Sequence, residues 1–200
     1  MVLAIYRIME AADGSITIDG HNAADLSLSR LRSSLSIIPQ DPVIFSGTLR
    51  QNLDPFNEFG EDQIWRALEL SHLKEFTSKL EGGLDFVLTE YGNNVSVGQK
   101  QLVCLARALL RKSKVLIMDE ATANVDLYTD DLIQKTIGRE FKECTVITIA
   151  HRLSTIMDHD MVLVLQNGEI QEFDSPKRLM DDRGSIFFSL AVDAGIVSAK

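Results

Sequence analysis

Two carboxylates directly follow a short apolar run in this sequence. Val115–Met118 predicts a buried strand, and Asp119 and Glu120 come immediately after it. In open α/β sheets, ligands bind beyond the carboxyl ends of the strands. There, Asp119 could hold Mg²⁺ through oxygen or water, and Glu120 could orient an attacking water. The alternative is that both acids only begin the next helix, where negative charge suits the helix dipole.

A polar loop of small residues leads into the clearest helical pattern, which runs from Gln99 to about Lys112. The residues at this junction are Ser96, Val97, Gly98 and Gln99. Backbone N–H groups and a serine hydroxyl at a helix N-terminus form an anion site suited to phosphate. The alternative is that Ser96 only caps the helix.

Two further polar side chains follow predicted strands. His151 comes after Thr145–Ile149, and Gln40 comes after Leu35–Ile38. The histidine could hydrogen-bond a terminal phosphate and the attacking water, and the glutamine could reach a metal or a water. Each also has a plain explanation as a polar residue at a strand exit.

These residues need a parallel sheet to bring them to one edge. The apolar runs Val115–Met118 and Thr145–Ile149 lack polar alternation, as expected of parallel strands buried on both faces, and a helical pattern at Leu127–Phe141 separates them. Asn167-Gly168 predicts a hairpin between Met161–Leu165 and Ile170–Phe173. The remaining predicted elements are helices at 1–11, Glu61–Leu70 and Leu73–Leu80 and a strand at Ser15–Gly20.

Composition describes a soluble globular chain. The 200 residues carry a net charge of −9, with 45% hydrophobic and 24% charged residues. The acidity argues against nucleic-acid binding, and no apolar run is long enough to span a membrane. Met1–Glu10 does not look like a signal peptide. Cys104 and Cys144 are expected to be buried free thiols of a reducing compartment.

Taken in order along the chain, these segments resemble the ATPase domain of ATP-binding-cassette (ABC) proteins. The resemblance makes Gln40 the Q-loop glutamine, Ser96–Gln99 the signature loop, Asp119 the Walker B aspartate and Glu120 the catalytic glutamate. Asp126 matches the D-loop, and His151 the switch histidine. Thr89-Glu90-Tyr91-Gly92 stands where exporters carry a Thr-Glu-x-Gly loop near their transmembrane contacts.

Finer detail resembles subfamily C, the multidrug-resistance-associated transporters. The segments that carry this resemblance are residues 52–56, 101–108 and 119–126. The signature loop departs from Leu-Ser-Gly-Gly-Gln by having Val95 and Val97, a variant similar to the second, C-terminal nucleotide-binding domain of that subfamily. The β-branched Val97 narrows the backbone geometry at the proposed phosphate contact.

One motif of the family is not in this sequence. No two of its 12 glycines are five residues apart and none precedes a lysine, so the P-loop pattern G-x-x-x-x-G-K-[ST] does not occur. We expect the chain to begin just after that loop.

The resemblance implies an α/β fold of the P-loop NTPase (RecA-like) type, with a parallel-sheet core and an inserted helical subdomain, lacking the N-terminal strands and the P-loop. Residues 1–45 and 114–172 would be core, 46–113 the helical insertion, and 173–200 a C-terminal helical extension.

The implied parent is an exporter whose cytoplasmic domain hydrolyses ATP with Mg²⁺, assisted by Asp119 and Gln40. Its implied partners are a second nucleotide-binding domain and transmembrane domains, with no nucleic acid and no membrane insertion by this chain. The signature loop would act in trans on ATP bound to the partner domain, and the isolated chain is expected to be inactive. The alternative is a non-catalytic module that docks on a partner ABC domain and supplies that loop. A chromosome-maintenance or DNA-repair ATPase is disfavoured by the negative charge and the lack of heptads.

Overall fold

The computed structural model describes residues 1–119, 121, 125–150 and 153–197, without the side chain of residue 154. These residues form two compact units, Met1–Ile149 and Ala150–Lys200, which we describe separately. Glu120 and His151 lie outside the described residues.

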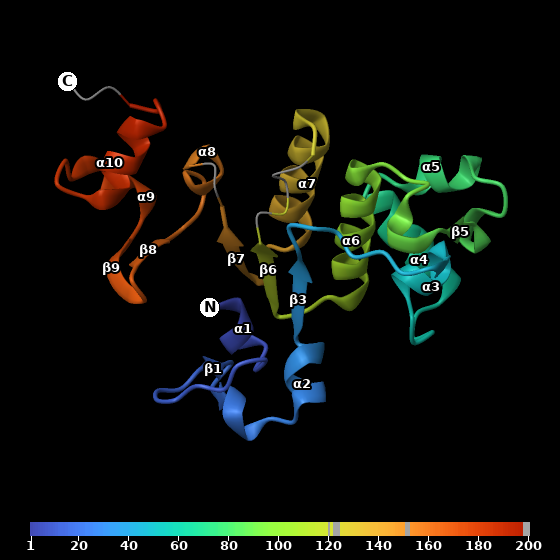
Figure 1. The fold of residues 1–200 in the computed structure, drawn as a ribbon, viewed down its shortest axis with the longest axis horizontal. Coiled ribbons are helices and arrows are strands. Elements are labelled where there is room, and N and C mark those ends of the chain that lie inside the picture. The colour runs from blue at the N-terminus through green and yellow to red at the C-terminus, as the bar shows by residue number, and fades with distance from the viewer. Residues whose placement is uncertain (120, 122–124, 151–152, 198–200) are drawn as a thin grey trace. The chain divides into compact units, whose positions relative to one another are not determined.

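A three-stranded parallel sheet is the centre of the first unit (Figure 1). Its order is β3 (Leu35–Ile38), β6 (Val115–Asp119) and β7 (Thr145–Ile149). The register pairs Ile38 with Met118 and Asp119 with Ile149, so the carboxyl ends of all three strands lie at one edge. The expected parallel core sheet is therefore confirmed.

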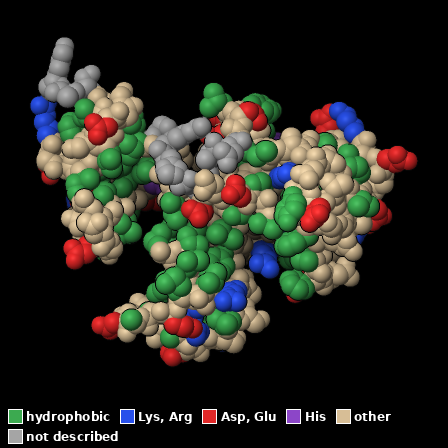
Figure 2. Space-filling view, viewed as in Figure 1, with side chains coloured by type: hydrophobic (Ala, Val, Ile, Leu, Met, Phe, Trp, Pro, Cys, Tyr) green, Lys and Arg blue, Asp and Glu red, His purple; other side chains and the backbone are tan. Residues whose placement is uncertain are grey.

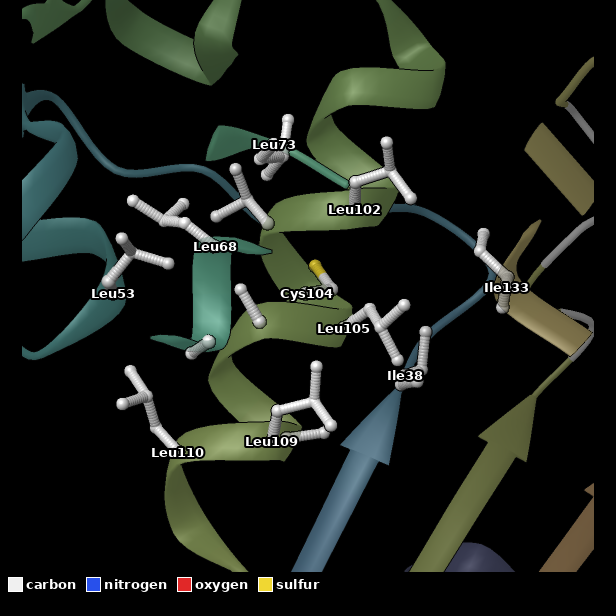
Figure 3. Close-up of a cluster of buried hydrophobic side chains, with 14 of the residues drawn as sticks. Ile38, Leu53, Leu68, Leu73, Leu102, Cys104, Leu105, Leu109, Leu110 and Ile133 are labelled. Carbon is white, nitrogen blue, oxygen red and sulfur yellow. The ribbon is translucent and has the colours of Figure 1, made fainter. Parts of the chain in front are cut away.

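Alternate residues of the sheet enter two different hydrophobic clusters, as the two-residue period of a strand requires. On one face, Ile38, Leu116 and Met118 join a cluster with α6 (Val97–Arg111), α4 (Glu61–Leu70) and α7 (Leu127–Glu140). Figure 3 shows α6 side chains such as Leu105 and Leu109 pointing into this cluster beside Ile38. Because α6 packs on β3, the position of its N-terminus, at Ser96, is fixed relative to the sheet.

On the other face, Leu35, Val115 and Ile117 pack with Ile5 and Leu31. The surrounding elements are α1 (Val2–Ile5), β1 (Thr17–Ile18), β2 (His21–Asn22), η1 (Ala23–Asp25) and α2 (Leu28–Ser33). Figure 2 shows hydrophobic side chains gathered at the surface around α1, where Leu3, Ile8 and Met9 are all exposed.

Short elements complete the first unit around α4 and α6. They are β4 (Gly47–Thr48), α3 (Leu49–Leu53), α5 (Lys74–Lys79), η2 (Gly83–Asp85), β5 (Val87–Leu88) and η3 (Glu90–Gly92). Strands β4 and β5 pair antiparallel. Helix α3 begins with a capping box in which the side chains of Thr48 and Gln51 each accept the other's backbone N–H.

Over its described residues, the second unit is a hairpin with three helices. The hairpin joins β8 (Val162–Gln166) to β9 (Glu169–Asp174), and the helices are α8 (Leu153–Ile156), α9 (Pro176–Asp181) and α10 (Ile186–Asp193). Asn167 and Gly168 both have positive φ, as a two-residue hairpin turn requires. The Glu172 carboxylate accepts the N–H groups of Ile186 and Phe187, which anchors α10 to β9.

Four expectations need correction. The helix predicted over residues 1–11 ends at Ile5, because Arg7 takes a positive φ and its guanidinium donates to the carbonyls of Ala23, Ala24 and Leu26. The strand predicted over Ser15–Gly20, closing on a turn, is shorter: β1 spans only Thr17–Ile18, and the turn at Asp19-Gly20 leads into its hairpin partner β2.

The other two corrections concern burial. Strand β7 is only half-buried, since among the described strands it pairs with β6 alone. Cys104 is a buried thiol as expected, but Cys144 is half-buried, with its Sγ 2.9 Å from the Ser113 carbonyl oxygen.

Candidate functional site

The carboxyl edge of the parallel sheet brings two of the predicted site residues to neighbouring strands. Asp119 is the last residue of β6 and is half-exposed. Gln40 lies two residues beyond the end of β3 and is exposed. Because Ile38 pairs with Met118, both side chains follow the same level of the sheet. A solvent-accessible carboxylate and amide oxygen are the hard donors that suit Mg²⁺, which keeps several of its waters.

The segment that contains Gln40, residues 39–43, is fastened to α6 at both ends. The Gln101 side chain donates from Nε2 to the Pro39 carbonyl at 2.9 Å. Further along the helix, Arg107 donates from Nη1 to the Val43 carbonyl at 2.6 Å.

The Arg107 guanidinium also holds α3. It donates from Nε to the Asn52 carbonyl at 2.6 Å and from Nη2 to Asn52 Oδ1 at 3.0 Å. Asn52 in turn accepts the Phe45 N–H and donates to the Phe45 carbonyl, and the guanidinium lies 5.9 Å from the Phe45 ring centroid. Burial lowers the pKa of Arg107 from its ordinary value, but an arginine remains charged at neutral pH.

The start of α6 forms a capping box. Ser96 Oγ accepts the Gln99 N–H at 3.1 Å, and Gln99 Oε1 accepts the Ser96 N–H at 2.9 Å. The interpretation of Ser96 as a helix cap is therefore confirmed. The N–H groups of Val97 and Gly98 donate to no group in the described part of the chain. Two free N–H groups at the N-terminus of a 15-residue helix are what an anion needs.

The start of α7 lies against the start of α6. Asp126 caps α7 by accepting the N–H groups of Tyr128 and Thr129, and its Oδ2 accepts the Thr129 hydroxyl at 2.8 Å. These hydrogen bonds, chiefly the one from the Thr129 backbone, hold the pKa of Asp126 below its ordinary value. A Cβ added at Gly98 would lie 3.2 Å from Thr129 Oγ1 and 3.7 Å from Asp126 Oδ2. The structure therefore places the predicted signature-loop and D-loop residues together.

A cavity of about 450 Å³ opens beside the fastened segment. Its walls come from β3, the segment that follows it, α3 and the C-terminal half of α6, and they include Val43, Phe45, Phe56, Cys104 and Arg107. The side chains of Val43, Phe45 and Phe56 are exposed by 52%, 64% and 71%. We call the residues Val43, Phe45 and Phe56 the apolar rim.

The Thr89–Gly92 loop packs against Ile44, which directly follows the fastened segment 39–43. Gly92 has φ +62°, and a Cβ there would lie 3.0 Å from the Ile44 side chain. Asn94 closes the loop by donating to the Val87 carbonyl and accepting the Thr89 N–H. Glu90 and Tyr91 are left exposed.

Several residues of this arrangement were not predicted as functional from the sequence. These residues are Gln101, Arg107, Asn52 and Thr129, and they act through contacts that no local spacing reveals. The one available signal was polarity at core positions, since Gln101 lies on the apolar stripe of α6 and is 1% exposed.

Comparisons with known proteins give consistent matches. The ABC transporter family model matches residues 1–123. The chain is 62% identical over 196 residues to ATP-binding cassette sub-family C member 3 of Mus musculus, covering 98% of this chain and 13% of that protein. It is 58% identical over 192 residues to sub-family C member 2 of Rattus norvegicus, covering 96% and 12%. It is 59% identical over 192 residues to multidrug resistance protein mrp-7 of Caenorhabditis elegans, covering 96% and 13%.

A solved structure matches in fold. The structure of a bacterial Atm1-family ABC exporter with ATP bound has a TM-score of 0.90 and 32% identity, covering 100% of this chain and 35% of that one. The chain thus spans a small part of each relative. Over the part of the chain that the structure describes, no helix is long and apolar enough to cross a bilayer.

Proposed function

We propose that this chain, which belongs to the ABC transporter family and is part of the nucleotide-binding domain of an exporter-type protein, couples ATP binding and hydrolysis to transmembrane transport. The observation that carries the proposal is the junction of α6 and α7. There, the N–H groups of Val97 and Gly98, which donate to no described residue, lie beside the Asp126 cap. We further propose that the chain belongs to the second nucleotide-binding domain of a sub-family C transporter, on the strength of its Ser-Val-Gly-Gln signature loop.

The residues divide into two half-sites. Ser96, Val97, Gly98 and Gln99 would bind the phosphates of a nucleotide held by the partner domain, because free N–H groups at a helix start stabilise negative charge. Bound Mg²⁺ would neutralise charge on the nucleotide's own phosphates. In the cis half-site, Asp119 and Gln40 would hold the Mg²⁺ of a second nucleotide, the one bound to this domain. By family resemblance, Glu120 would orient the attacking water and His151 would contact the terminal phosphate.

The domain boundaries follow the same proposal. Residues 46–113 act as the helical subdomain, residues 1–45 and 114–172 as the core, and residues 173–200 as a C-terminal extension. The signature loop then belongs to the helical part and Asp119 to the core.

The apolar rim is the proposed contact with the transmembrane domains. Val43, Phe45 and Phe56 expose apolar surface around a cavity, and the relatives have most of their length outside the region that this chain matches. We propose that a short amphipathic segment of the exporter's own transmembrane domains inserts there, on the cytoplasmic side of the membrane. Force on the rim would reach α6 through Arg107 and Asn52.

Nucleotide binding by the chain alone tests the division into half-sites. The 200 residues contain no P-loop pattern, so the cis half-site has no lysine or loop N–H groups for the phosphates. We expect only weak ATP binding and almost no turnover by the purified chain. A titration with a fluorescent ATP analogue measures this, and low-micromolar, Mg²⁺-dependent affinity would contradict the division.

The alternative is a module that only docks on a partner ABC domain and supplies the signature loop. It shares the α6–α7 junction but needs no cis half-site. The transcript upstream of residue 1 distinguishes the two, since an in-frame P-loop and membrane spans there support the exporter.

A further inference from the structure

Gln101 is a buried glutamine with an unusual hydrogen-bonding pattern. Its side chain is 1% exposed, and its Nε2 donates to the Pro39 carbonyl at 2.9 Å, 62 residues away in sequence. Its Oε1 is buried and has no partner among the described residues. A buried acceptor without a donor costs at least as much stability as one neutral hydrogen bond contributes. Stability alone therefore does not account for a glutamine here.

The one hydrogen bond that Gln101 makes joins the two half-sites of the proposed function. Pro39 directly precedes Gln40, the candidate ligand of Mg²⁺ and water. Gln101 lies two residues after Gln99 on α6, the helix whose first turn would hold the partner's nucleotide. The bond thus links the first turns of α6 to the backbone next to Gln40.

A second contact to α6 holds the other end of the segment that contains Gln40. Arg107 lies six residues further along α6, about 9 Å of helix rise, and it donates to the Val43 carbonyl. The backbone from Pro39 to Val43 can extend at most about 14 Å. Residues 40–42 are therefore a short segment fixed at both ends to the same helix. The Gln40 side chain makes no hydrogen bond to any described residue, so its position depends on these two anchors.

We propose that Gln101 is a positioning residue that holds Gln40 at the carboxyl edge of the sheet and transmits movement of the α6 N-terminus to it. The hydrogen bond itself does not depend on the proposed function, but its consequence for ATP hydrolysis rests on that function. When α6 shifts as its first turn binds nucleotide in trans, the Pro39 carbonyl moves with it. Gln101 therefore couples occupancy of the trans half-site to the position of Gln40 in the cis half-site.

Backbone ¹⁵N relaxation on the 200-residue chain tests the anchor. Gln101→Met keeps the volume and removes the donor, and Gln101→Asn keeps the amide but is too short to reach Pro39. In both variants, we expect the order parameters of the Gln40 and Asp41 N–H groups to fall from the range of rigid backbone, about 0.85, toward that of flexible backbone, below about 0.6. The order parameters of the second half of α6 should not change. The asparagine variant carries the test if the methionine variant does not fold.

Thr77→Val is the matched control, because Thr77 Oγ1 is also buried and has no described partner, but it lies on α5. It should leave the order parameters of Gln40 and Asp41 unchanged. Unchanged order parameters at Gln40 and Asp41 in the Gln101 variants would overturn the anchor, as would an equal fall across the first unit.

Hydrolysis in the full-length exporter that contains this segment then tests the consequence. We expect Gln101→Met to lower kcat and raise the Mg²⁺ requirement, with an unchanged KM for ATP. An unchanged kcat and Mg²⁺ requirement would refute the positioning role and leave the proposed function intact. Loss of the proposed function would show instead as a wild-type exporter without ATPase activity.

Discussion

Replacing Arg107 by methionine should destabilise the first unit strongly. The guanidinium donates three hydrogen bonds to oxygen, two to backbone carbonyls at 2.6 Å and one to Asn52 Oδ1 at 3.0 Å, besides a longer contact of 3.8 Å to Cys104 Sγ. Hydrogen bonds to a charged group are worth about 1.5–3 kcal/mol each, which sets an upper limit near 4.5–9 kcal/mol. The guanidinium also loses hydration on burial, which offsets several kcal/mol of that gain. We therefore expect the free energy of unfolding to fall by about 2–4 kcal/mol.

Urea unfolding followed by tryptophan fluorescence measures this change. Trp65 is the single tryptophan of the chain, lies on α4, and packs against the same hydrophobic cluster as α6. With an m-value of about 2 kcal/mol/M, the midpoint should fall by about 1–2 M. The fluorescence reports on the first unit, so unfolding of the second unit does not confuse the result.

Arg107→Lys is the matched control. It keeps the charge and most of the side-chain stem but has one ammonium in place of the planar fork, so it should lose about half as much stability. A loss below about 1 kcal/mol for Arg107→Met, or equal losses for both variants, would refute the claim that the fork fastens the segment after Gln40 to α6.

Two other predictions follow from single contacts. Gly92→Ala forces an alanine into positive φ and brings its Cβ to 3.0 Å from Ile44, so the free energy of unfolding should fall by about 2–4 kcal/mol. Gly138 lies on α7, and a Cβ there has nothing within 4 Å. Gly138→Ala should therefore raise the free energy of unfolding by about 0.5–1 kcal/mol in the same urea assay. Asp126 has a folded pKa below its unfolded value, so its stabilising contribution is complete above the ordinary Asp pKa of about 3.9 and is lost as pH falls below it. Amide exchange at Thr129, corrected for intrinsic rate, should accelerate in that acidic range, and Asp126→Asn should abolish the pH response.

Local signals predicted the elements that carry strong periodicity. Strand β3 and helix α4 have the expected bounds, and the Asn167-Gly168 hairpin forms as predicted. Helix α2 was not predicted, although Ser27 caps it by accepting the Arg30 N–H. It is six residues long, too short for periodicity to stand out.

Tertiary contacts decided what local signals could not. The apolar pattern of residues 1–11 continues past Ile5, but Arg7 leaves the helix to donate to carbonyls 16 to 19 residues away. Likewise, the order of motifs predicted the signature-loop and D-loop residues, whereas the contacts of Arg107 and Gln101 span 55 to 64 residues. No spacing rule reaches that far, so the anchors of the Gln40 segment appear only in the fold.

The start of α6 is proposed to bind a nucleotide that a partner domain holds. The most direct measurement is the association of this chain with a partner nucleotide-binding domain that has an intact P-loop and a catalytic glutamate replaced by glutamine. We predict that sedimentation shows a complex only with Mg²⁺ and ATP. Gly98→Asp, which adds a carboxylate beside Thr129 and Asp126, should weaken it at least tenfold, whereas Gly138→Asp, with nothing within 4 Å, should not. Association without nucleotide, or equal effects of both substitutions, would contradict nucleotide binding at the start of α6.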